Sequence, residues 1–318
     1  MASKITIDLL LPRRNGGVVK WGEDLVEALS GKDFTFRVFR GEKAVLKYLL
    51  FSKKGDLIHT TIPLPWKPGR RPLILTIHGF FKKEKNIWSK IYPHVIKLAD
   101  KITTPTQWLK EKLDLPQIQV IPNGIFLNQE IIKKNFNFNN KNEINILTIT
   151  NFNFYEKCHG IKFIYEAFKQ LDLSGKKIIF HILGDGEFRN NLEKEMKSQN
   201  KLKVIFHGFQ KPDPFFKKAD IFVHYSFLDI LPLVLLEAMN YGLPIISNNF
   251  GAASEIIDDK KNGLIINSSG QLARAIKKII ENDSWANQLG KKARLKAEEQ
   301  YDWYNLAGSW SKIYQSLI

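Results

Sequence analysis

The sequence lacks several features that define large classes of protein. Only one cysteine, Cys158, is present among 318 residues, which excludes an internal disulfide framework and favours a reducing compartment. No apolar run in the sequence approaches the roughly 20 residues that are needed to span a bilayer. The apolar run at residues 9–11 is not followed by a small-residue cleavage site, which argues against a signal peptide. These absences lead us to expect a cytoplasmic protein.

Common catalytic and metal-binding motifs are also missing. The sequence has no GxxxxGK[ST] phosphate loop and no GxSxG nucleophile elbow, which argues against an ATPase and a serine hydrolase. The seven histidines are scattered, and the lone cysteine has no partner at zinc spacing. We therefore expect no metal and no bound cofactor.

The positive charge of the chain is unevenly distributed. Its formal net charge is +16, and residues 1–140 carry 24 Lys and Arg against 12 Asp and Glu, whereas residues 141–318 carry 24 against 20. A basic field of this kind favours anionic lipid headgroups, phosphorylated acceptors or nucleic acid. Lysine-rich solvated faces are the alternative explanation. No recognised nucleic-acid motif accompanies the charge, so we expect no nucleic-acid partner.

Short β-branched runs alternate with segments of helical periodicity along the whole chain. The length indicates two domains, and the hydrophobic content of 44% is enough for sizeable cores. Continuous apolar strands between helices predict parallel sheets that are covered on both faces. Strands are predicted at residues 4–11, 73–78, 118–121, 144–149, 178–183, 203–206 and 220–225, and helices at residues 18–29 and 88–99.

A polar, Asn-rich stretch at residues 133–143 marks the predicted boundary between two α/β domains. It carries turn formers and no apolar periodicity, although Phe136 and Phe138 are candidates for local docking. The last 16 residues, 303–318, form a predicted amphipathic helix that crosses back to brace the first domain. Ligands of open parallel sheets bind beyond the carboxyl ends of the strands, so two facing sheets would place a cleft between the domains.

The segment from Phe227 to Gly242 combines two carboxylates with the start of an apolar helix. Asp229 comes just before Pro232, and Glu237 follows Asp229 by eight residues. The start of a helix has free N–H groups and the positive end of the dipole, which together attract phosphate. This arrangement suits a phosphate-linked sugar nucleotide. An ordinary amphipathic core helix with an acid at each edge is the alternative.

The loop after the first predicted strand holds a glycine pair. Gly16 and Gly17 let the backbone approach an anion closely, and Arg13 and Arg14 add positive charge. An ordinary strand-to-helix turn explains the pair equally well. His78 ends a later predicted strand. A lone histidine is more often structural than catalytic, whereas its position at the carboxyl edge favours a contact with a ligand.

Three further segments carry candidates. Residues 80–90 interleave basic and aromatic side chains, which fits an acceptor or membrane contact as well as a simple loop. Lys157 and His159 follow the first strand of the second half and supply a cation and a titratable ring. Glu255 lies in the glycine-marked turn at residues 250–263, where its carboxylate is expected to face the cleft.

These motifs, in this order, resemble the family 4 retaining glycosyltransferases of GT-B architecture, which has two Rossmann-like domains. The likeness covers nearly the whole chain and is weakest in residues 31–72 and 128–143. It implies an N-terminal acceptor-side domain over 1–134, a C-terminal domain over 135–302 that binds the nucleotide sugar, and a helix over 303–318 that packs on the first domain. The motifs are GG at 16–17, ADKITTPTQWLKEKL at 99–113, VIPNGI at 120–125, ILGDGE at 182–187, LLEAMNYGLPII at 235–246 and GAASEII at 251–257.

The resemblance implies a retaining transfer of a sugar from a nucleoside diphosphate sugar to a hydroxyl acceptor. The sequence offers no aspartate pair for a metal, so we expect activity without a divalent ion. The resemblance also implies that the acceptor is anionic or lies at a membrane surface, because such enzymes take the acceptor in the first domain, which is basic here. The implied catalytic residues are His78 near the transferred sugar, Lys157 on the leaving phosphates and Asp229 on the sugar hydroxyls. The implied donor-binding residues are Gly16, Gly17, Leu231, Pro232, Leu233, Glu237 on the ribose, and Glu255.

The sequence departs from the family pattern at the donor site. The family usually has Glu at the position of Asp229 and Gly at the position of Ile230. Phe152 or Phe154 stands where an arginine of the phosphate clamp is expected, and the lysine of the clamp aligns with Lys157 or with His159. A non-catalytic sugar-nucleotide-binding or scaffold protein is therefore the alternative function, and a sugar-nucleotide epimerase of the same fold is a further one.

Overall fold

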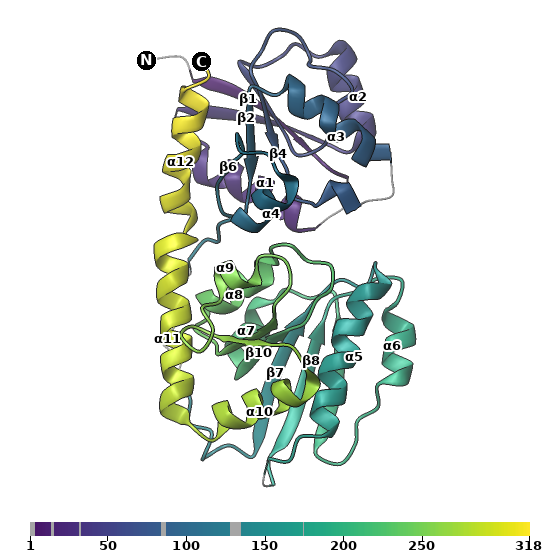
Figure 1. The fold of residues 1–318 in the computed structure, drawn as a ribbon, viewed down its shortest axis with the longest axis vertical. Coiled ribbons are helices and arrows are strands. Elements are labelled where there is room, and N and C mark those ends of the chain that lie inside the picture. Colours follow the sequence, from purple (N-terminus) through teal and green to yellow (C-terminus); the bar gives the residue numbers. More distant parts are fainter. Residues whose placement is uncertain (1–3, 14–15, 32, 84–86, 128–134, 174) are drawn as a thin grey trace. The chain divides into compact units, whose positions relative to one another are not determined.

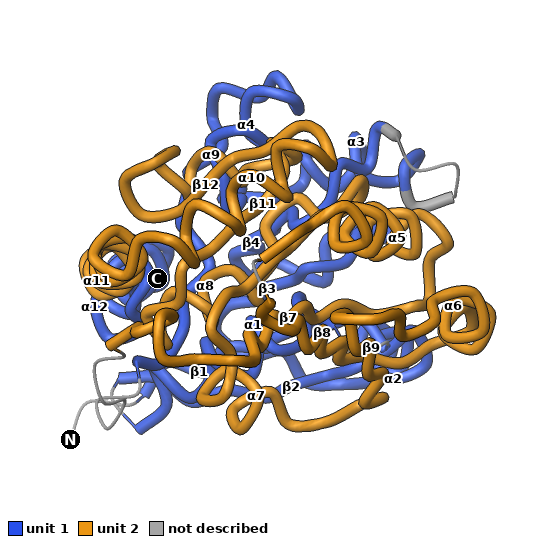
Figure 2. Tube along the Cα trace, turned by 90° about the horizontal axis from the view of Figure 1, so that it is seen from below, with its two compact units in different colours: residues 1–127, 300–318 blue, residues 128–299 orange. Residues whose placement is uncertain are grey.

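The computed structural model describes residues 4–13, 16–31, 33–83, 87–127, 135–173 and 175–318. The chain divides into two compact units (Figure 2), one formed by residues 1–127 together with 300–318, the other by residues 128–299. Each unit is built on a six-stranded sheet in which every strand pair is parallel. The predicted α/β class with two parallel sheets is therefore confirmed. The predicted boundary at residue 134 lies outside the described residues.

The first unit has the strand order β2-β1-β3-β4-β5-β6. Figure 1 labels several of its strands and helices. Its strands are β1 (Ile5–Leu11), β2 (Phe34–Arg40), β3 (Leu57–Thr60), β4 (Leu73–Thr76), β5 (Lys101–Thr104) and β6 (Gln119–Val120). Its helices are α1 (Gly17–Leu29), α2 (Glu42–Phe51), a 3-10 turn at Phe81–Lys83, α3 (Ile87–Leu98), α4 (Gln107–Leu113) and α12 (Trp303–Gln315).

The second unit has the strand order β12-β11-β10-β7-β8-β9. Its strands are β7 (Glu143–Ile149), β8 (Lys177–Leu183), β9 (Leu202–Gly208), β10 (Ile221–His224), β11 (Ile245–Asn248) and β12 (Leu264–Ile266). Its helices are α5 (Tyr155–Lys169), α6 (Arg189–Glu195), α7 (Asp213–Lys218), α8 (Leu233–Asn240), α9 (Ala253–Ile256), α10 (Ser269–Ile280) and α11 (Asp283–Gln300).

Side chains alternate between the two faces of the first sheet, and each face has its own core. Ile7, Leu57 and Ile74 pack with α1 and α12, whereas Leu10, Ile58 and Leu73 pack with α2 and with residues at the end of α3. This alternation follows from the period of two along a strand. The two layers of helices position the loops at the carboxyl ends of the strands, where parallel sheets bind ligands.

The last helix completes the core of the first unit, as predicted. Trp303, Trp310 and Tyr314 of α12 are almost completely buried against α1 and the sheet. The backbone fixes the start of this helix, because the Trp303 N–H donates to the Ile125 carbonyl over 3.1 Å. Gly124 makes room for the indole, since a Cβ at that position would lie 2.7 Å from Trp303 Cδ2. The glycine of the VIPNGI segment therefore has a packing role.

The segment after the crossing between the units is docked on its own unit. Phe136 and Phe138 are buried and stacked, with ring centroids 5.7 Å apart. Their backbone N–H groups donate to the Asn287 and Asp283 side chains of α11, over 2.8 and 2.7 Å. The two phenylalanines therefore anchor this polar stretch.

In the chain as described, no helix is both long enough and apolar enough to cross a bilayer.

A buried histidine also joins α12 to the sheet. His59 Nδ1 lies 2.8 Å from the Tyr314 hydroxyl, and His59 Nε2 lies 2.6 Å from Thr76 Oγ1. Burial, together with the nearby His78, lowers the pKa of His59 to about 3. The folded state therefore holds this imidazole neutral, whereas the unfolded chain protonates it near its ordinary pKa of about 6.5.

We expect the free energy of unfolding to fall as the pH drops below about 6.5, by at most about 1.4 kcal/mol per pH unit for this group. The unfolded chain binds the extra proton, so stability rises with pH in this window. Urea unfolding at several pH values for wild type and His59→Gln measures it, because the variant should show the smaller slope. His94→Gln, at an exposed position of α3, is the matched control variant. Equal slopes for wild type and His59→Gln would contradict the assignment.

Candidate functional site

An ion pair lies at the carboxyl ends of β7 and β10 in the second unit. Lys157, in the first turn of α5, places its Nζ atom 2.7 Å from Oδ1 of Asp229, in the loop after β10. The Lys157 and Asp229 side chains are only 10% and 21% exposed. His224, the last residue of β10, places Nε2 at 3.4 Å from Oδ2 of Asp229. Two of the predicted catalytic residues are therefore in direct contact.

The environment of Asp229 keeps its carboxyl ionised. Burial raises the pKa of Asp229, but the polar contact with His224 and the positive charge of Lys157 outweigh burial. The pKa of Asp229 therefore lies well below its ordinary range. A carboxylate held in this way accepts hydrogen bonds from hydroxyl groups and does not act as an acid near neutral pH.

Backbone and side-chain hydrogen bonds position the Asp229 loop. Ser226 Oγ accepts hydrogen bonds from the N–H groups of Leu228 and Asp229, over 3.1 and 3.0 Å. Asn248, at the end of β11, holds Ser226 in turn, because its Oδ1 accepts from the Ser226 N–H and its Nδ2 donates to the Ser226 carbonyl. Ser226 and Asn248 are both buried, so the loop is fixed by groups shielded from water.

A glycine in α5 lets Lys157 reach the carboxylate. A Cβ built on Gly160 would lie 1.9 Å from the carbonyl oxygen of Tyr225, so only glycine allows α5 this close to the end of β10. On the opposite side, Gly251 has φ +60°, and a Cβ there would lie 2.6 Å from the carbonyl oxygens of Asp229 and Ile230. Close backbone packing on two sides thus fixes the Asp229 segment.

The segment from Leu231 to Leu233 forms the entrance to α8. Pro232 takes the N-cap position, α8 begins at Leu233, and no side chain among the described residues caps this end. Free N–H groups and the positive end of the dipole are therefore available for an anion. The Ile230 carbonyl accepts a hydrogen bond from the Ala252 N–H over 2.8 Å. Ile230, which replaces the family's usual glycine, is therefore held by the GAASEII segment.

Two further predicted carboxylates lie on neighbouring helices. Glu237 is half-buried in the second turn of α8, and Glu255 is half-buried in α9. Burial, Asp213 and then Glu237 raise the pKa of Tyr241, which keeps this hydroxyl protonated. Lys296 Nζ donates to the backbone carbonyl of Glu255 over 2.8 Å, which ties α9 to α11.

The structure accounts for the phenylalanines that replace the expected arginine. Phe152 is completely buried, and its N–H and carbonyl are bonded to the backbone of Asp185 and Phe188. Phe154 is 44% exposed at the N-cap of α5. His159 is exposed and packs its ring on Tyr155, with centroids 4.7 Å apart. Of the two candidates for the clamp lysine, Lys157 is therefore the residue that contacts Asp229.

The first unit contains a separate cavity of about 300 Å³ beyond the carboxyl ends of its strands. His78 lies on its wall, two residues after β4 ends at Thr76. The observed strand is therefore shorter than the strand predicted at residues 73–78. Burial lowers the pKa of His78 to about 3, and its Nε2 atom has no hydrogen-bond partner among the described residues. The cavity is lined by Pro12, Val18, Gly41, Glu42, Thr61, Ile62, Pro63, His78, Gly79 and Tyr92.

The predicted glycine pair lies at the start of α1 in this unit. Gly16 is the N-cap residue, with φ 168°, and Gly17 is the first residue of the helix. A Cβ at Gly16 would meet nothing within 4 Å, so nothing in the structure itself requires glycine at this position. Arg13 is exposed beside the pair, whereas Arg14 lies outside the described residues.

The sequence analysis missed three residues that build the site. His224, Ser226 and Asn248 are buried polar residues that contact Asp229 or hold its loop. All three lie in or just after strands β10 and β11, so their position at the carboxyl edge of the sheet was the available signal. In the part of the chain that is described, no group of three or more His, Cys, Asp or Glu residues is arranged to hold a metal ion.

Comparisons with protein-family models cover most of the chain. Residues 129–296 match the family described as glycosyl transferases group 1, and residues 13–129 match the family described as glycosyltransferase family 4. The division between the two matches falls near residue 128, where the second unit begins.

Individual relatives share modest identity with the chain. An uncharacterized glycosyltransferase of Methanocaldococcus jannaschii is 30% identical over 169 residues, which are 51% of this chain and 43% of that protein. The chain thus spans less than half of that relative's length. The UDP-Gal:alpha-D-GlcNAc-diphosphoundecaprenol alpha-1,3-galactosyltransferase of Escherichia coli is 26% identical over 285 residues, or 78% of this chain and 72% of that protein.

Among solved structures, Anabaena HepE in complex with UDP superposes with a TM-score of 0.76. The two chains share 18% sequence identity, and the match covers 98% of this chain and 100% of HepE. At this identity the likeness shows the fold, which is the GT-B arrangement of two Rossmann-like units that the sequence motifs predicted.

Proposed function

Because the chain belongs to the group 1 glycosyl transferases, we propose that it moves a sugar from a nucleoside diphosphate sugar to a hydroxyl acceptor with retention of the anomeric configuration. The observation that carries the proposal is the Lys157–Asp229 pair beside the uncapped start of α8. It puts a cation, an ionised carboxylate and free backbone N–H groups together at the carboxyl edge of one sheet. A diphosphate joined to a sugar has complementary groups for all three.

In the proposed reaction, the bond between the anomeric carbon and the phosphate oxygen breaks, and its electron pair passes to the diphosphate. The acceptor oxygen bonds to the anomeric carbon on the same face, and its proton passes to the departing diphosphate. Lys157 and the backbone N–H groups of Leu231 and Leu233 stabilise the negative charge that grows on the leaving group. Electrostatic stabilisation of this kind, aimed at developing charge, is usually the largest single contribution to catalysis.

The other residues are proposed to bind rather than to react. The ionised Asp229 accepts hydrogen bonds from sugar hydroxyls, and Glu237 accepts them from the ribose. Glu255 lies in the GAASEII segment that packs on residues 229–230, and it contacts the sugar or a phosphate.

The residues of the first unit have binding roles of their own. Gly16 and Gly17 are proposed to lie against the diphosphate. His78 is proposed to contact the transferred sugar. It does so as a neutral imidazole, because its pKa is lowered to about 3.

The donor and the acceptor follow from separate observations. HepE, which has the same fold, was solved with UDP, so uridine diphosphate sugars are the first donors to test. The E. coli relative is named for an acceptor on a diphosphoundecaprenol carrier, and residues 1–140 of this chain carry the excess positive charge. We therefore propose an acceptor that is anionic or is carried on a membrane lipid.

A panel of uridine diphosphate sugars, incubated with the protein and followed by NMR, tests the reaction. We expect consumption of one donor, a product with the anomeric configuration of that donor, and an unchanged rate after addition of EDTA. Metal independence is expected because Lys157 and helix dipole groups supply the positive charge that a divalent ion provides in other sites. An inverted product, or a rate abolished by EDTA and restored by Mg²⁺, would rule out this mechanism.

A non-catalytic donor-binding protein is the second candidate function. The absent arginine and the Ile230 substitution favour it, because an arginine at the position of Phe152 or Phe154 would supply about 1.5–3 kcal/mol of charged hydrogen bonding that is missing here. The same panel separates the two functions. Slow hydrolysis of a donor in the absence of acceptor supports the enzyme, whereas tight binding of a donor with no turnover supports the binding protein.

A further inference from the structure

Helix α2 presents apolar side chains to solvent. Its buried residues Val45, Tyr48 and Leu49 pack on the sheet of the first unit. On the outward side, Leu46, Leu50 and Phe51 are 51%, 55% and 80% exposed. Large apolar side chains grouped on one helix face differ from the single exposed residues that are normal on protein surfaces. This face is therefore a candidate interaction surface.

Lysines are interleaved with these apolar side chains. Lys43 and Lys47 lie on the outward side of α2, one turn apart, and Lys53 follows the helix, all three exposed. Among the described residues, no carboxylate forms an ion pair with any of the three. We call this set the α2 surface: Lys43, Leu46, Lys47, Leu50, Phe51 and Lys53.

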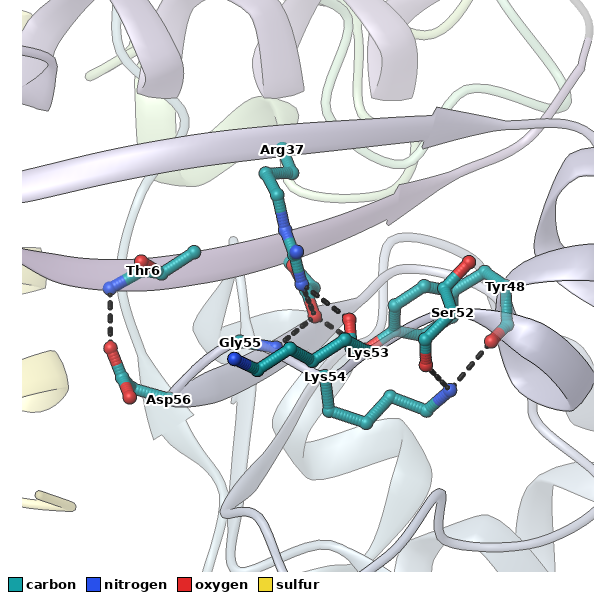
Figure 3. A network of polar contacts seen from close by, with 9 residues as sticks. Thr6, Arg37, Tyr48, Ser52, Lys53, Lys54, Gly55 and Asp56 are labelled. Carbon is teal, nitrogen blue, oxygen red and sulfur yellow. Dashed lines mark hydrogen bonds and ion pairs between the residues drawn. The ribbon is translucent and has the colours of Figure 1, made fainter.

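A buried network holds α2 in a fixed orientation (Figure 3). Asp8 of β1 accepts hydrogen bonds from Arg37 Nε and Nη2, at 2.6 and 2.8 Å, from the Tyr48 hydroxyl at 2.7 Å, and from the Gly55 N–H at 2.6 Å. Burial, followed by the contact with Asp8, raises the pKa of Tyr48, so its hydroxyl remains a donor. The middle of α2 is thus tied to β1, the strand next to the edge strand β2.

The end of α2 is fixed by a lysine that turns inward. Lys54 Nζ donates to the carbonyls of Tyr48 and Ser52, over 2.6 and 2.8 Å, and lies 4.3 Å from the centroid of the Tyr48 ring. A cation at the C-terminal end of a helix satisfies carbonyls that lack partners and complements the dipole. Lys54 therefore stabilises the helix, whereas Lys43, Lys47 and Lys53 stay available outside.

From this combination we infer that the α2 surface docks on an anionic lipid bilayer. Exposed lysines beside large apolar side chains suit a membrane interface, where lysine ammonium groups meet phosphates and apolar groups enter the acyl boundary. The excess charge of residues 1–140 complements such a surface. A protein partner fits this surface less well than a bilayer, because protein interfaces are depleted of lysine. A second copy of the chain also fits less well, because it would set these lysines against like charges.

This inference extends the proposed acceptor but does not depend on the reaction. Vesicle binding is measured without donor or acceptor, so its failure leaves the glycosyl transfer open, and the absence of any turnover leaves the lipid contact open. The two proposals are therefore tested separately.

Cosedimentation with vesicles of phosphatidylcholine alone, and of an equal mixture with phosphatidylglycerol, tests the docking. We expect wild type to bind the anionic vesicles and to lose binding at high salt. The double variant Lys43→Glu/Lys47→Glu should weaken binding by at least about 25-fold, since each lysine near an anionic surface contributes about fivefold. The double variant Leu50→Ser/Phe51→Ser should weaken it by about tenfold or more.

Matched variants on the second unit control for charge and apolar content in general. Lys291→Glu/Lys292→Glu removes two exposed lysines of α11, and Phe209→Ser removes a phenylalanine that is 85% exposed. Both should bind anionic vesicles as wild type does, and circular dichroism should be unchanged in all variants.

Three outcomes would overturn the inference. The first is equal binding to neutral and anionic vesicles, and the second is binding by the α2 variants at the wild-type level. The third is a concentration-dependent dimer in the absence of lipid that Leu50→Ser/Phe51→Ser abolishes, which would assign the surface to a second copy of the chain.

Discussion

Replacing Lys157 by methionine is expected to lower kcat by about 10²–10³, because it removes one preorganised positive group from the leaving diphosphate. It also leaves Asp229 ionised, mostly buried and without its cation, so the free energy of unfolding should fall by about 2 kcal/mol. Methionine keeps an unbranched side chain of similar shape and removes the ammonium group that bears the charge and donates to Asp229. Steady-state kinetics on the donor found in the NMR panel, together with urea unfolding, measure both effects.

A double variant separates catalysis from structure at this pair. Lys157→Met/Asp229→Asn removes both charges, so most of the lost stability should return, whereas kcat should stay low because neither group is restored. Lys162→Met on the same helix is the control, since its pair with Glu195 is partly exposed and should contribute less than about 1 kcal/mol. Recovery of kcat in the double variant would show that the pair only supports the fold.

Gly160→Ala is expected to disturb the same site from a distance. The added methyl group would lie 1.9 Å from the Tyr225 carbonyl oxygen, so α5 must move away from the end of β10. Overpacking against backbone costs about 3 kcal/mol, and a displacement of about 1 Å at Lys157 is enough to reduce kcat by about 100-fold. The measurements are the urea midpoint and the rate of donor consumption.

Gly308→Ala provides the matched control, because Gly308 also lies inside a helix, α12, but a Cβ there meets nothing within 4 Å. This change should raise the free energy of unfolding by about 0.5–1 kcal/mol through helix propensity and leave kcat unchanged. If the two alanine variants had the same urea midpoint and the same rate of donor consumption, the close approach of α5 to Tyr225 would not be required for activity.

Strands with a continuous apolar run were predictable from the sequence, and several short or half-exposed strands were not. β7, β8 and β10 are continuous apolar runs, as expected for the centre of a parallel sheet. β2 was missed because it is an edge strand in which only Phe34 is fully buried and the other side chains are partly or wholly exposed. β3 has only four residues, and the buried polar His59 interrupts its pattern. β5 and β11, with four residues each, and β12, with three, were also missed.

The position of the candidate residues at the carboxyl edge of the sheet was predictable, and their contacts with one another were not. Strand ends and glycine-marked loops pointed to Lys157, Asp229 and the start of α8, because parallel strands expose their carboxyl ends at one edge. The pairing of Lys157 with Asp229, which are 72 residues apart, depends on how closely α5 approaches β10. No local pattern encodes that approach. His224 was missed for the same reason, since its contact with Asp229 exists only in the folded loop.

The burial of α12 in the first unit limits which segments of this protein can be exchanged with those of a relative. The first unit needs residues 1–127 and residues 300–318, so it is assembled from two separated stretches of the gene. A chimera that exchanges only the leading stretch would pair a foreign sheet with Trp303, Trp310 and Tyr314, side chains shaped for a different partner. Exchange of acceptor preference between relatives is therefore expected to succeed when residues 300–318 are exchanged together with residues 1–127.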